Sequence, residues 1–129
     1  MAKQTDTKQT AATAHDAATI LVVDDETGPR ESLKMILTPP YRVITANDGK
    51  QALARFDAHV PDMVITDIRM PVMTGVDLMR AVKERSPDTP VVIITGYGTL
   101  QTAQEAVRSG ADEFIMKPFD SGIIRSKFA

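Results

Sequence analysis

The sequence predicts an α/β fold in which five parallel strands form one sheet with helices on both faces. From Ile20 onward, short apolar runs alternate with helix-like segments, an order typical of parallel strands joined by right-handed helical crossovers. Four of the five runs are almost continuously apolar, as strands covered on both faces of a sheet require. A chain of 129 residues also suits a single domain.

The apolar runs give the order of the strands along the chain. They predict strands at residues 20–23, 41–46, 63–66, 91–94 and 113–116. In the second run apolar and polar side chains alternate, which is typical of a strand at the edge of the sheet.

Capping and stop signals between the strands indicate the helices. The helices are expected to begin near Pro29, at Asn47 or Asp48, at Asp77, near Thr99 and after Asp120. Ala103, Ala106 and Val107 form the apolar stripe of the fourth helix, and Gly110 is placed to end it. The fifth helix has about ten residues, close to the practical minimum for a packed helix.

Composition excludes several classes of protein. The 15 basic and 17 acidic side chains give a net charge of -2, so no overall basic field attracts nucleic acid or an anionic membrane. The chain has no cysteine, which removes disulfides, thiolate metal sites and cysteine nucleophiles. No apolar stretch reaches the roughly 18 residues of a membrane span. We expect a cytoplasmic folded domain at residues 20–129, with no membrane or direct nucleic acid contact, after a disordered polar tail at residues 1–19.

Polar side chains follow four of the predicted strands at the point where each strand ends. Asp67 follows the third strand, and the pair Asp24 and Asp25 follows the first. Thr95 and Lys117 follow the fourth and fifth strands. Because the carboxyl ends of parallel strands meet at one edge of a sheet, where ligands of such folds bind, these side chains are expected to form one site.

Three acids, a hydroxyl and an ammonium suggest phosphoryl chemistry. A hard divalent cation, for which Mg²⁺ is the natural candidate, would reduce the repulsion between an attacking carboxylate and a phosphate. Asp25 and Asp67 suffice as ligands, with Asp24 holding a metal-bound water. Lys117 can neutralise one phosphoryl oxygen, and the Thr95 hydroxyl can donate a hydrogen bond to another. The expected product is an aspartyl phosphate on Asp67.

In this order and spacing, the residues resemble the receiver domain of two-component response regulators. The resemblance runs from about Ile20 to Phe119 and rests on Asp24-Asp25, Asp67 within DIRMP, Gly75, Thr95-Gly96 and Lys117-Pro118-Phe119. It implies a doubly wound, flavodoxin-like sheet with strand order 2-1-3-4-5. It also implies Mg²⁺ as cofactor, and phosphorylation of Asp67 by a histidine kinase or a phosphotransfer protein. Such a domain is a phosphoacceptor that assists its own phosphorylation and dephosphorylation, not an enzyme.

The resemblance also implies a role for each site residue. Asp25, Asp67 and the backbone carbonyl of Arg69 correspond to direct magnesium ligands, and Asp24 to a ligand through water. The backbone of Arg69 and Gly96 would contact the phosphoryl group. Lys117 corresponds to the phosphate-binding lysine, whose bond to the following proline is usually cis in the family.

Two further pairs of residues have roles implied by the family alone. Thr95 corresponds to the switch hydroxyl and Phe114 to the switch aromatic, although the strand position of Phe114 equally suits a core residue. Arg69 and Tyr97 correspond to positions that shape access of the hydrolytic water, and their bulk predicts slow self-dephosphorylation. Tyr97 is equally well explained as a surface aromatic.

Two other functions are compatible with part of this pattern. A phosphatase of the haloacid dehalogenase type also uses a strand-end aspartate, magnesium and a lysine, but it needs a second aspartate where this chain has Arg69. A degenerate receiver that acts as an unphosphorylated interaction module normally lacks an acid or the lysine, and none is missing here. The last helix is shorter than is usual in the family, whose homodimers use the fourth helix, fifth strand and fifth helix.

Overall fold

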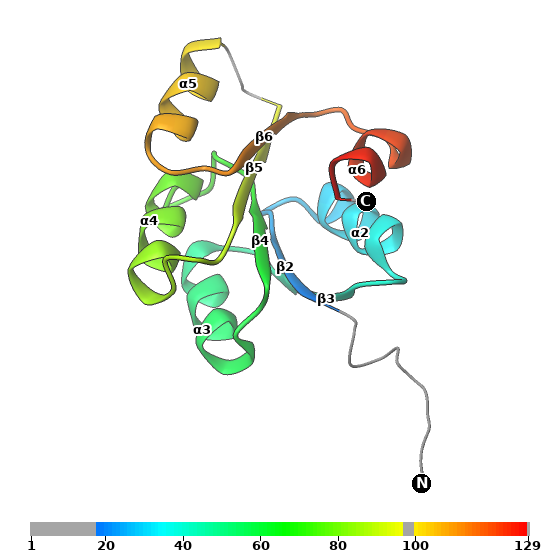
Figure 1. Ribbon diagram of the computed structural model, residues 1–129, viewed down its shortest axis with the longest axis horizontal. Coiled ribbons are helices and arrows are strands. Elements are labelled where there is room, and N and C mark those ends of the chain that lie inside the picture. Colours follow the sequence, from blue (N-terminus) through cyan, green and yellow to red (C-terminus); the bar gives the residue numbers. More distant parts are fainter. Residues whose placement is uncertain (1–17, 97–99, 129) are drawn as a thin grey trace, which may run out of the picture.

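The computed structural model describes residues 18–96 and 100–128 and contains one sheet of five parallel strands (Figure 1). The strands are β2 (Thr19–Val23), β3 (Arg42–Ala46), β4 (Met63–Thr66), β5 (Val91–Thr95) and β6 (Glu113–Met116). The helices are α2 (Thr27–Leu37), α3 (Gly49–His59), α4 (Gly75–Arg85), α5 (Leu100–Arg108) and α6 (Ser121–Phe128). The strand order is β3-β2-β4-β5-β6, so the predicted order 2-1-3-4-5 is confirmed.

The register of the sheet brings the carboxyl ends of its central strands level with each other. Val23 at the end of β2 is paired with Thr66 at the end of β4, and Ala46 lies opposite Val23 on the other side. β3 pairs with β2 alone in the sheet, which confirms the predicted edge strand. β2 begins at Thr19, one residue before the prediction, because Thr19 pairs with Arg42. The expected tail lies outside the described residues as far as residue 17.

The sheet separates two hydrophobic clusters, and each is covered by its own helices (Figure 1). α3, α4 and α5 cover one face, and their buried residues there are Ala52, Phe56, Leu78, Met79, Val82 and Ala106. α2 and α6 cover the other face with Leu33, Leu37 and Ile124. Adjacent β2 residues alternate between the clusters, with Leu21 in the first and Val22 in the second. Each such fully buried aliphatic side chain stabilises the fold by about 1.5–3 kcal/mol.

The sequence left two candidates for the start of α3 and placed the start of α4 too late. Asp48 caps α3, because its side chain accepts a hydrogen bond from the Gln51 amide at 2.7 Å. α4 begins two residues before the predicted start at Asp77, with Thr74 as its cap. The Thr74 hydroxyl accepts from the Asp77 amide, and the Asp77 carboxylate accepts from the Thr74 amide. Asp77 is therefore the third helical residue of a capping box.

The last two helices differ from expectation in detail. Gly110 has a φ of 116°, a conformation that favours glycine, and it ends α5 as predicted. The prediction that Val107 belongs to the apolar stripe was wrong, because Ala106 is fully buried and Val107 is 55% exposed. Consecutive residues of a helix point about 100° apart, so the side chain of Val107 is turned away from the buried direction of Ala106 and toward solvent. The expected cap Thr99 lies outside the described residues.

α6 has 8 residues, slightly fewer than predicted. Among the described residues, no helix combines the length and apolar character that a membrane crossing requires.

Candidate functional site

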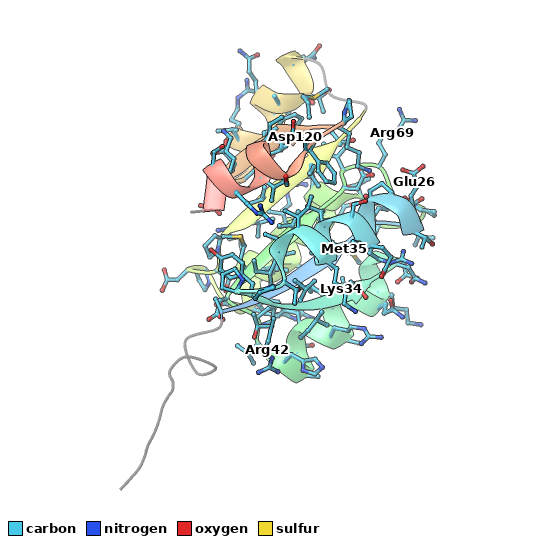
Figure 2. The ribbon with its side chains drawn as sticks, turned by 90° about the vertical axis from the view of Figure 1, so that its right-hand side faces the viewer. Glu26, Lys34, Met35, Arg42, Arg69 and Asp120 are labelled. Atoms are coloured by element: carbon cyan, nitrogen blue, oxygen red, sulfur yellow. The ribbon has the colours of Figure 1, made fainter. Side chains whose placement is uncertain are left out.

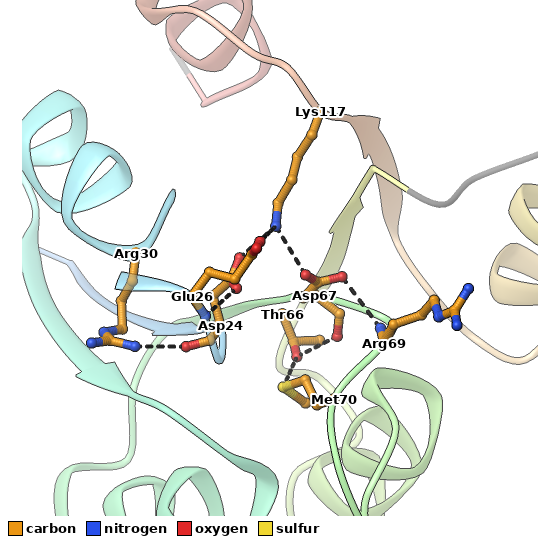
Figure 3. A network of polar contacts seen from close by, with 8 residues as sticks. All are labelled: Asp24, Glu26, Arg30, Thr66, Asp67, Arg69, Met70 and Lys117. Atoms are coloured by element: carbon orange, nitrogen blue, oxygen red, sulfur yellow. Dashed lines mark hydrogen bonds and ion pairs between the residues drawn. The ribbon is translucent and has the colours of Figure 1, made fainter. Parts of the chain in front are cut away.

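Three charged side chains meet at the carboxyl edge of the sheet. Asp24 follows β2, Asp67 follows β4 and Lys117 follows β6. The Lys117 Nζ atom lies 2.7 Å from Asp24 Oδ2 and 2.9 Å from Asp67 Oδ2 (Figure 3). β5 separates β6 from β4, so the long lysine side chain is what brings the ammonium to the two acids. The tertiary structure thus joins residues that are 93 and 50 positions apart in the chain.

Asp24 is 1% exposed and is held by several hydrogen bonds. Its amide donates to the Ala46 carbonyl at 3.2 Å, which continues the strand pairing. Its Oδ1 atom accepts from the Glu26 amide at 2.9 Å. Its carbonyl accepts from Arg30 Nη1 at 2.8 Å, and Arg30 Nη2 also donates to the Thr27 hydroxyl. The first turn of α2 therefore holds the acidic loop in place.

Asp67 is 2% exposed and is fixed through its backbone as well as its carboxylate. Its amide donates to the Val23 carbonyl at 3.0 Å, and its Oδ1 atom accepts from the Arg69 amide at 3.3 Å. Gly75 packs against the Asp67 carbonyl so closely that a Cβ atom at residue 75 would overlap it. A larger residue there would displace the loop that carries Asp67.

The electrostatics of the site follow from burial and from this shared lysine. Burial raises the pKa of Asp24, and hydrogen bonds from Lys117 and the Glu26 amide offset that rise only in part. Burial alone would lower the pKa of Lys117, but its hydrogen bonds to Asp24 and Asp67 and their charges outweigh burial, so the pKa of Lys117 is raised. Lys117 therefore remains an ammonium at physiological pH, with more negative than positive charge around it.

Glu26 is a residue that the sequence interpretation missed. Single carboxylate oxygens of Asp24, Glu26 and Asp67 lie within 4.8 Å of one another. The Glu26 Oε1 atom is also 3.6 Å from Lys117 Nζ. The run of three acids from Asp24 to Glu26 was the available signal, since the third acid belongs to the same short loop.

A surface depression beside the site is lined by Asp25, the predicted direct metal ligand, as well as by Glu26 and Asp67. Asp25 does not belong to the close cluster of carboxylates described above. The depression has a volume of about 410 Å³ and is lined by Asp25, Glu26, Asp67, Ile68, Arg69, Met70, Pro71 and Thr74. Figure 2 shows Glu26 and Arg69 at the same margin of the molecule, where their side chains reach solvent. The assignment of Asp25 as a ligand remains a prediction.

The other predicted site residues lie around Lys117 or in the core. Thr95 is fully buried, and its carbonyl accepts from the Lys117 amide at 2.9 Å. Gly96 faces the Lys117 side chain, since a Cβ atom there would lie 3.7 Å from Lys117 Cβ. The Lys117–Pro118 peptide bond is cis, as the resemblance implied. Phe114 is partly buried against the cluster covered by α3, α4 and α5, and Tyr97 lies outside the described residues.

Comparison with known families decides what kind of domain carries this site. Residues 20–129 match the family model of the response regulator receiver domain. The chain belongs to that family. The receiver domain is 36% identical over 105 residues to the regulatory protein LuxO of Vibrio cholerae, and 39% identical over 107 residues to the transcriptional regulatory protein ZraR of Escherichia coli K12. These alignments cover 81% and 82% of the chain but 23% and 24% of the relatives, so the chain spans about a quarter of their length.

Solved structures support the same assignment for the fold. The chemotaxis protein CheY4 of Vibrio cholerae has a TM-score of 0.81 at 33% identity, over 87% of this receiver domain and 96% of that chain. The receiver domain of NtrX from Brucella abortus has a TM-score of 0.78 at 37% identity, over 84% and 95% of the two chains. The receiver domain is therefore a signalling domain of a family whose members interact with histidine kinases or phosphotransfer proteins.

Proposed function

We propose that Asp67 of this receiver domain accepts a phosphoryl group from a phosphohistidine of a kinase or phosphotransfer protein, and that the modified domain presents a changed interaction surface. The observation that carries the proposal is the contact of one ammonium, on Lys117, with two buried carboxylates, on Asp24 and Asp67. Asp67 lines the open depression and has Oδ1 turned to the Arg69 amide. Although Asp67 is 2% exposed, the depression that it lines is open to solvent, and a phosphodonor would approach its carboxylate through that depression.

The donor set fits Mg²⁺. The carboxylates of Asp24, Glu26 and Asp67 lie together, and Asp25 lines the same depression. The ammonium of Lys117 balances part of this negative charge. Hard oxygen donors with excess negative charge are what this cation prefers. Asp67 and Asp25 or Glu26 would hold it, with the Arg69 carbonyl, and Asp24 would act through water. When bound, Mg²⁺ lowers the repulsion between the carboxylate and the phosphoryl oxygens.

The protein groups then perform the transfer. A carboxylate oxygen of Asp67 attacks phosphorus, and the phosphorus–nitrogen bond to the donor histidine breaks with its electron pair left on the imidazole. Lys117 is already within hydrogen-bonding distance of Asp67 and can follow the transferred oxygens with its charge. The backbone amides of Arg69 and Gly96, and the Thr95 hydroxyl, would donate to the remaining phosphoryl oxygens. The domain thereby assists its own modification and its later hydrolysis.

The response would be read on the surface formed by α5, β6 and α6. Movement of Thr95 toward the phosphoryl group would leave space for the Phe114 ring, which is partly buried in this structure. Such a change would favour a homodimer or another partner on that surface without a direct nucleic acid contact by this domain. The proposal places the domain in the cytoplasm, where histidine kinases present their phosphohistidine.

Intact mass after incubation with acetyl phosphate and Mg²⁺ tests the proposal. One phosphoryl group should add about 80 Da. The added mass should disappear in Asp67→Asn and with a chelator, and should persist in Asp88→Asn, an exposed aspartate of the turn before β5. A folded protein that never gains this mass would support the unphosphorylated interaction module, and continuous release of phosphate would support a phosphatase.

A further inference from the structure

Thr66, the residue immediately before Asp67, has a buried hydroxyl that bonds to the backbone of the site. Thr66 is the last residue of β4 and is fully buried. Its Oγ1 atom donates to the Asp67 carbonyl at 2.9 Å, and Met70 Sδ lies 3.9 Å away as a weaker partner (Figure 3). The hydroxyl is thus directed to the peptide that leaves Asp67.

Gly75 restrains the same peptide from another direction. The Asp67 carbonyl lies where a Cβ atom of Gly75 would be, and the Gly75 amide donates to the Ile68 carbonyl at 2.9 Å. Thr66 and Gly75 therefore act on two successive carbonyls. Together they determine the orientation of the Asp67–Ile68 peptide and the path of the chain into Arg69.

The orientation of the Asp67–Ile68 peptide affects the carboxylate through the peptide that follows it. The Arg69 amide, two residues on, donates to Asp67 Oδ1, while Lys117 donates to Asp67 Oδ2. The Thr66 hydroxyl bonds to the Asp67–Ile68 peptide, and the Arg69 amide belongs to the next peptide. Rotation of the first peptide would displace the second and move the Arg69 amide away from the carboxylate. We infer that Thr66 is a positioning residue, whose hydroxyl holds the Asp67–Ile68 peptide so that the carboxylate stays aligned between Lys117 and the Arg69 amide. The inference rests on the proposed function of Asp67 as phosphoacceptor.

A threonine that only fills the core would behave differently from one that positions the site. Thr66→Val keeps the shape of the side chain and removes the hydroxyl, whereas Thr66→Ser keeps the hydroxyl and removes a methyl group. Small misalignments of reacting groups slow a reaction strongly, so we expect Thr66→Val to lower the rate of phosphoryl transfer about tenfold. Thr66→Ser should stay within about threefold of the unchanged protein, because its hydroxyl can still reach the carbonyl.

Thr89 offers a matched control at the opposite edge of the sheet. It is also a buried threonine, and its hydroxyl donates to Ser86 Oγ at 2.7 Å, in the turn before β5. Thr89→Val therefore removes a buried hydroxyl with a hydrogen bond but no link to Asp67. It should lower the melting temperature about as much as Thr66→Val and leave the transfer rate unchanged.

The experiment measures phosphorylation by acetyl phosphate against the concentrations of donor and Mg²⁺, with melting temperatures from circular dichroism. Thr66→Val should lower the rate at saturation of both, because the defect lies in alignment. Equal rates in Thr66→Val and the unchanged protein would overturn the inference, and so would equal slowing by Thr66→Val and Thr89→Val.

Two further results keep the test decisive. If Thr66→Val does not fold, Thr66→Ser and Thr66→Ala differ by the hydroxyl alone, and similar rates in that pair would overturn the inference. If the unchanged protein takes up no phosphoryl group, the proposed function fails, which is distinguishable from a failure of the role of Thr66 alone.

Discussion

Two lysine–aspartate contacts at opposite edges of the sheet have almost the same geometry and opposite electrostatics. Lys117 lies 2.7 Å from Asp24 at the carboxyl edge, and Lys83 lies 2.9 Å from Asp112 at the amino edge. The pKa of Asp24 is raised because burial outweighs its hydrogen bonds. Burial alone would raise the pKa of Asp112, but hydrogen bonds from the Val91 amide and Lys83 and the charge of Lys83 together outweigh burial, so the pKa of Asp112 is lowered.

The difference lies in exposure and in how completely the charges are paired. The Asp24 side chain is 1% exposed and that of Asp112 is 48% exposed. Lys83 also donates to the Thr89 carbonyl at 2.8 Å, so its contacts join α4 to the start of β5 and the residue before β6. At the carboxyl edge several carboxylates share Lys117, which leaves unbalanced negative charge that can attract a cation. The Lys83–Asp112 contact at the amino edge therefore stabilises the fold, whereas the excess negative charge around Lys117 at the carboxyl edge destabilises it.

Replacement of the two lysines should separate the two edges most clearly. Lys117→Met removes the ammonium that contacts the buried carboxylates of Asp24 and Asp67. Loss of one partner of a buried pair costs about 3–5 kcal/mol. We expect a fall of about 3 kcal/mol in the free energy of unfolding without divalent cations, measured with urea, and loss of phosphorylation. Lys83→Met, the matched control, should cost below about 1 kcal/mol and leave phosphorylation intact. Equal destabilisation by the two variants would contradict the comparison.

Divalent cation affinity tests which acids create the excess charge. Glu26→Gln should weaken Mg²⁺ binding about fivefold, because it removes one charged oxygen donor worth about 1 kcal/mol. Titration calorimetry measures this effect beside Asp25→Asn, which tests the ligand that the sequence predicted. Glu31→Gln, at an exposed position of α2, is the control. If the affinity for Mg²⁺ were unchanged in Glu26→Gln and reduced in Asp25→Asn, the ligand would be Asp25, as the sequence predicted, and not Glu26.

Asp24 should be destabilising at neutral pH when no cation is present. Because its pKa is raised in the folded state, its contribution to stability is present below the usual value of about 3.9 and is lost as the pH rises through the folded-state pKa. Asp24→Asn should therefore raise the free energy of unfolding at pH 7 by about 1 kcal/mol, and the gain should vanish near pH 3. Urea unfolding in a chelator at both pH values measures it. A loss of stability at pH 7 in Asp24→Asn would show that the attraction between Lys117 and Asp24 outweighs the cost of burying the Asp24 carboxylate.

Asp112 should show the opposite sign and a smaller effect. With its pKa lowered, its contribution is present above about 3.9 and is lost as the pH falls through the folded-state pKa. Because the side chain is half exposed, Asp112→Asn should cost less than about 1 kcal/mol at pH 7. The difference from the unchanged protein should disappear in acid, as followed by thermal unfolding between neutral and acidic pH. A cost that grows on acidification would reverse the assigned sign.

Local pattern was sufficient for most of the architecture. Near-continuous apolar runs indicate covered parallel strands, and Gly110 indicates the end of α5, because both depend on neighbouring residues in the chain. Val107 was misplaced because the small side chains of Ala103 and Ala106 mark the inward face of α5 only weakly, and the larger apolar Val107 beside them was taken for part of that face. Asp77 was taken for the start of α4 because a capping box contains two polar residues that each suit a helix start.

By itself, the sequence determined the strand order through a recognisable family pattern, and it determined which acids, hydroxyl and lysine end the strands. The strand-end residues could be read locally, since each is identified by the apolar run before it, and the strand order came from the family pattern as a whole. Only the tertiary structure decided that Lys117 contacts Asp24 and Asp67 together, that Glu26 joins their cluster and that the Thr66 hydroxyl bonds to the Asp67 carbonyl. These contacts depend on the reach of side chains and the paths of loops, which are set by packing between distant segments.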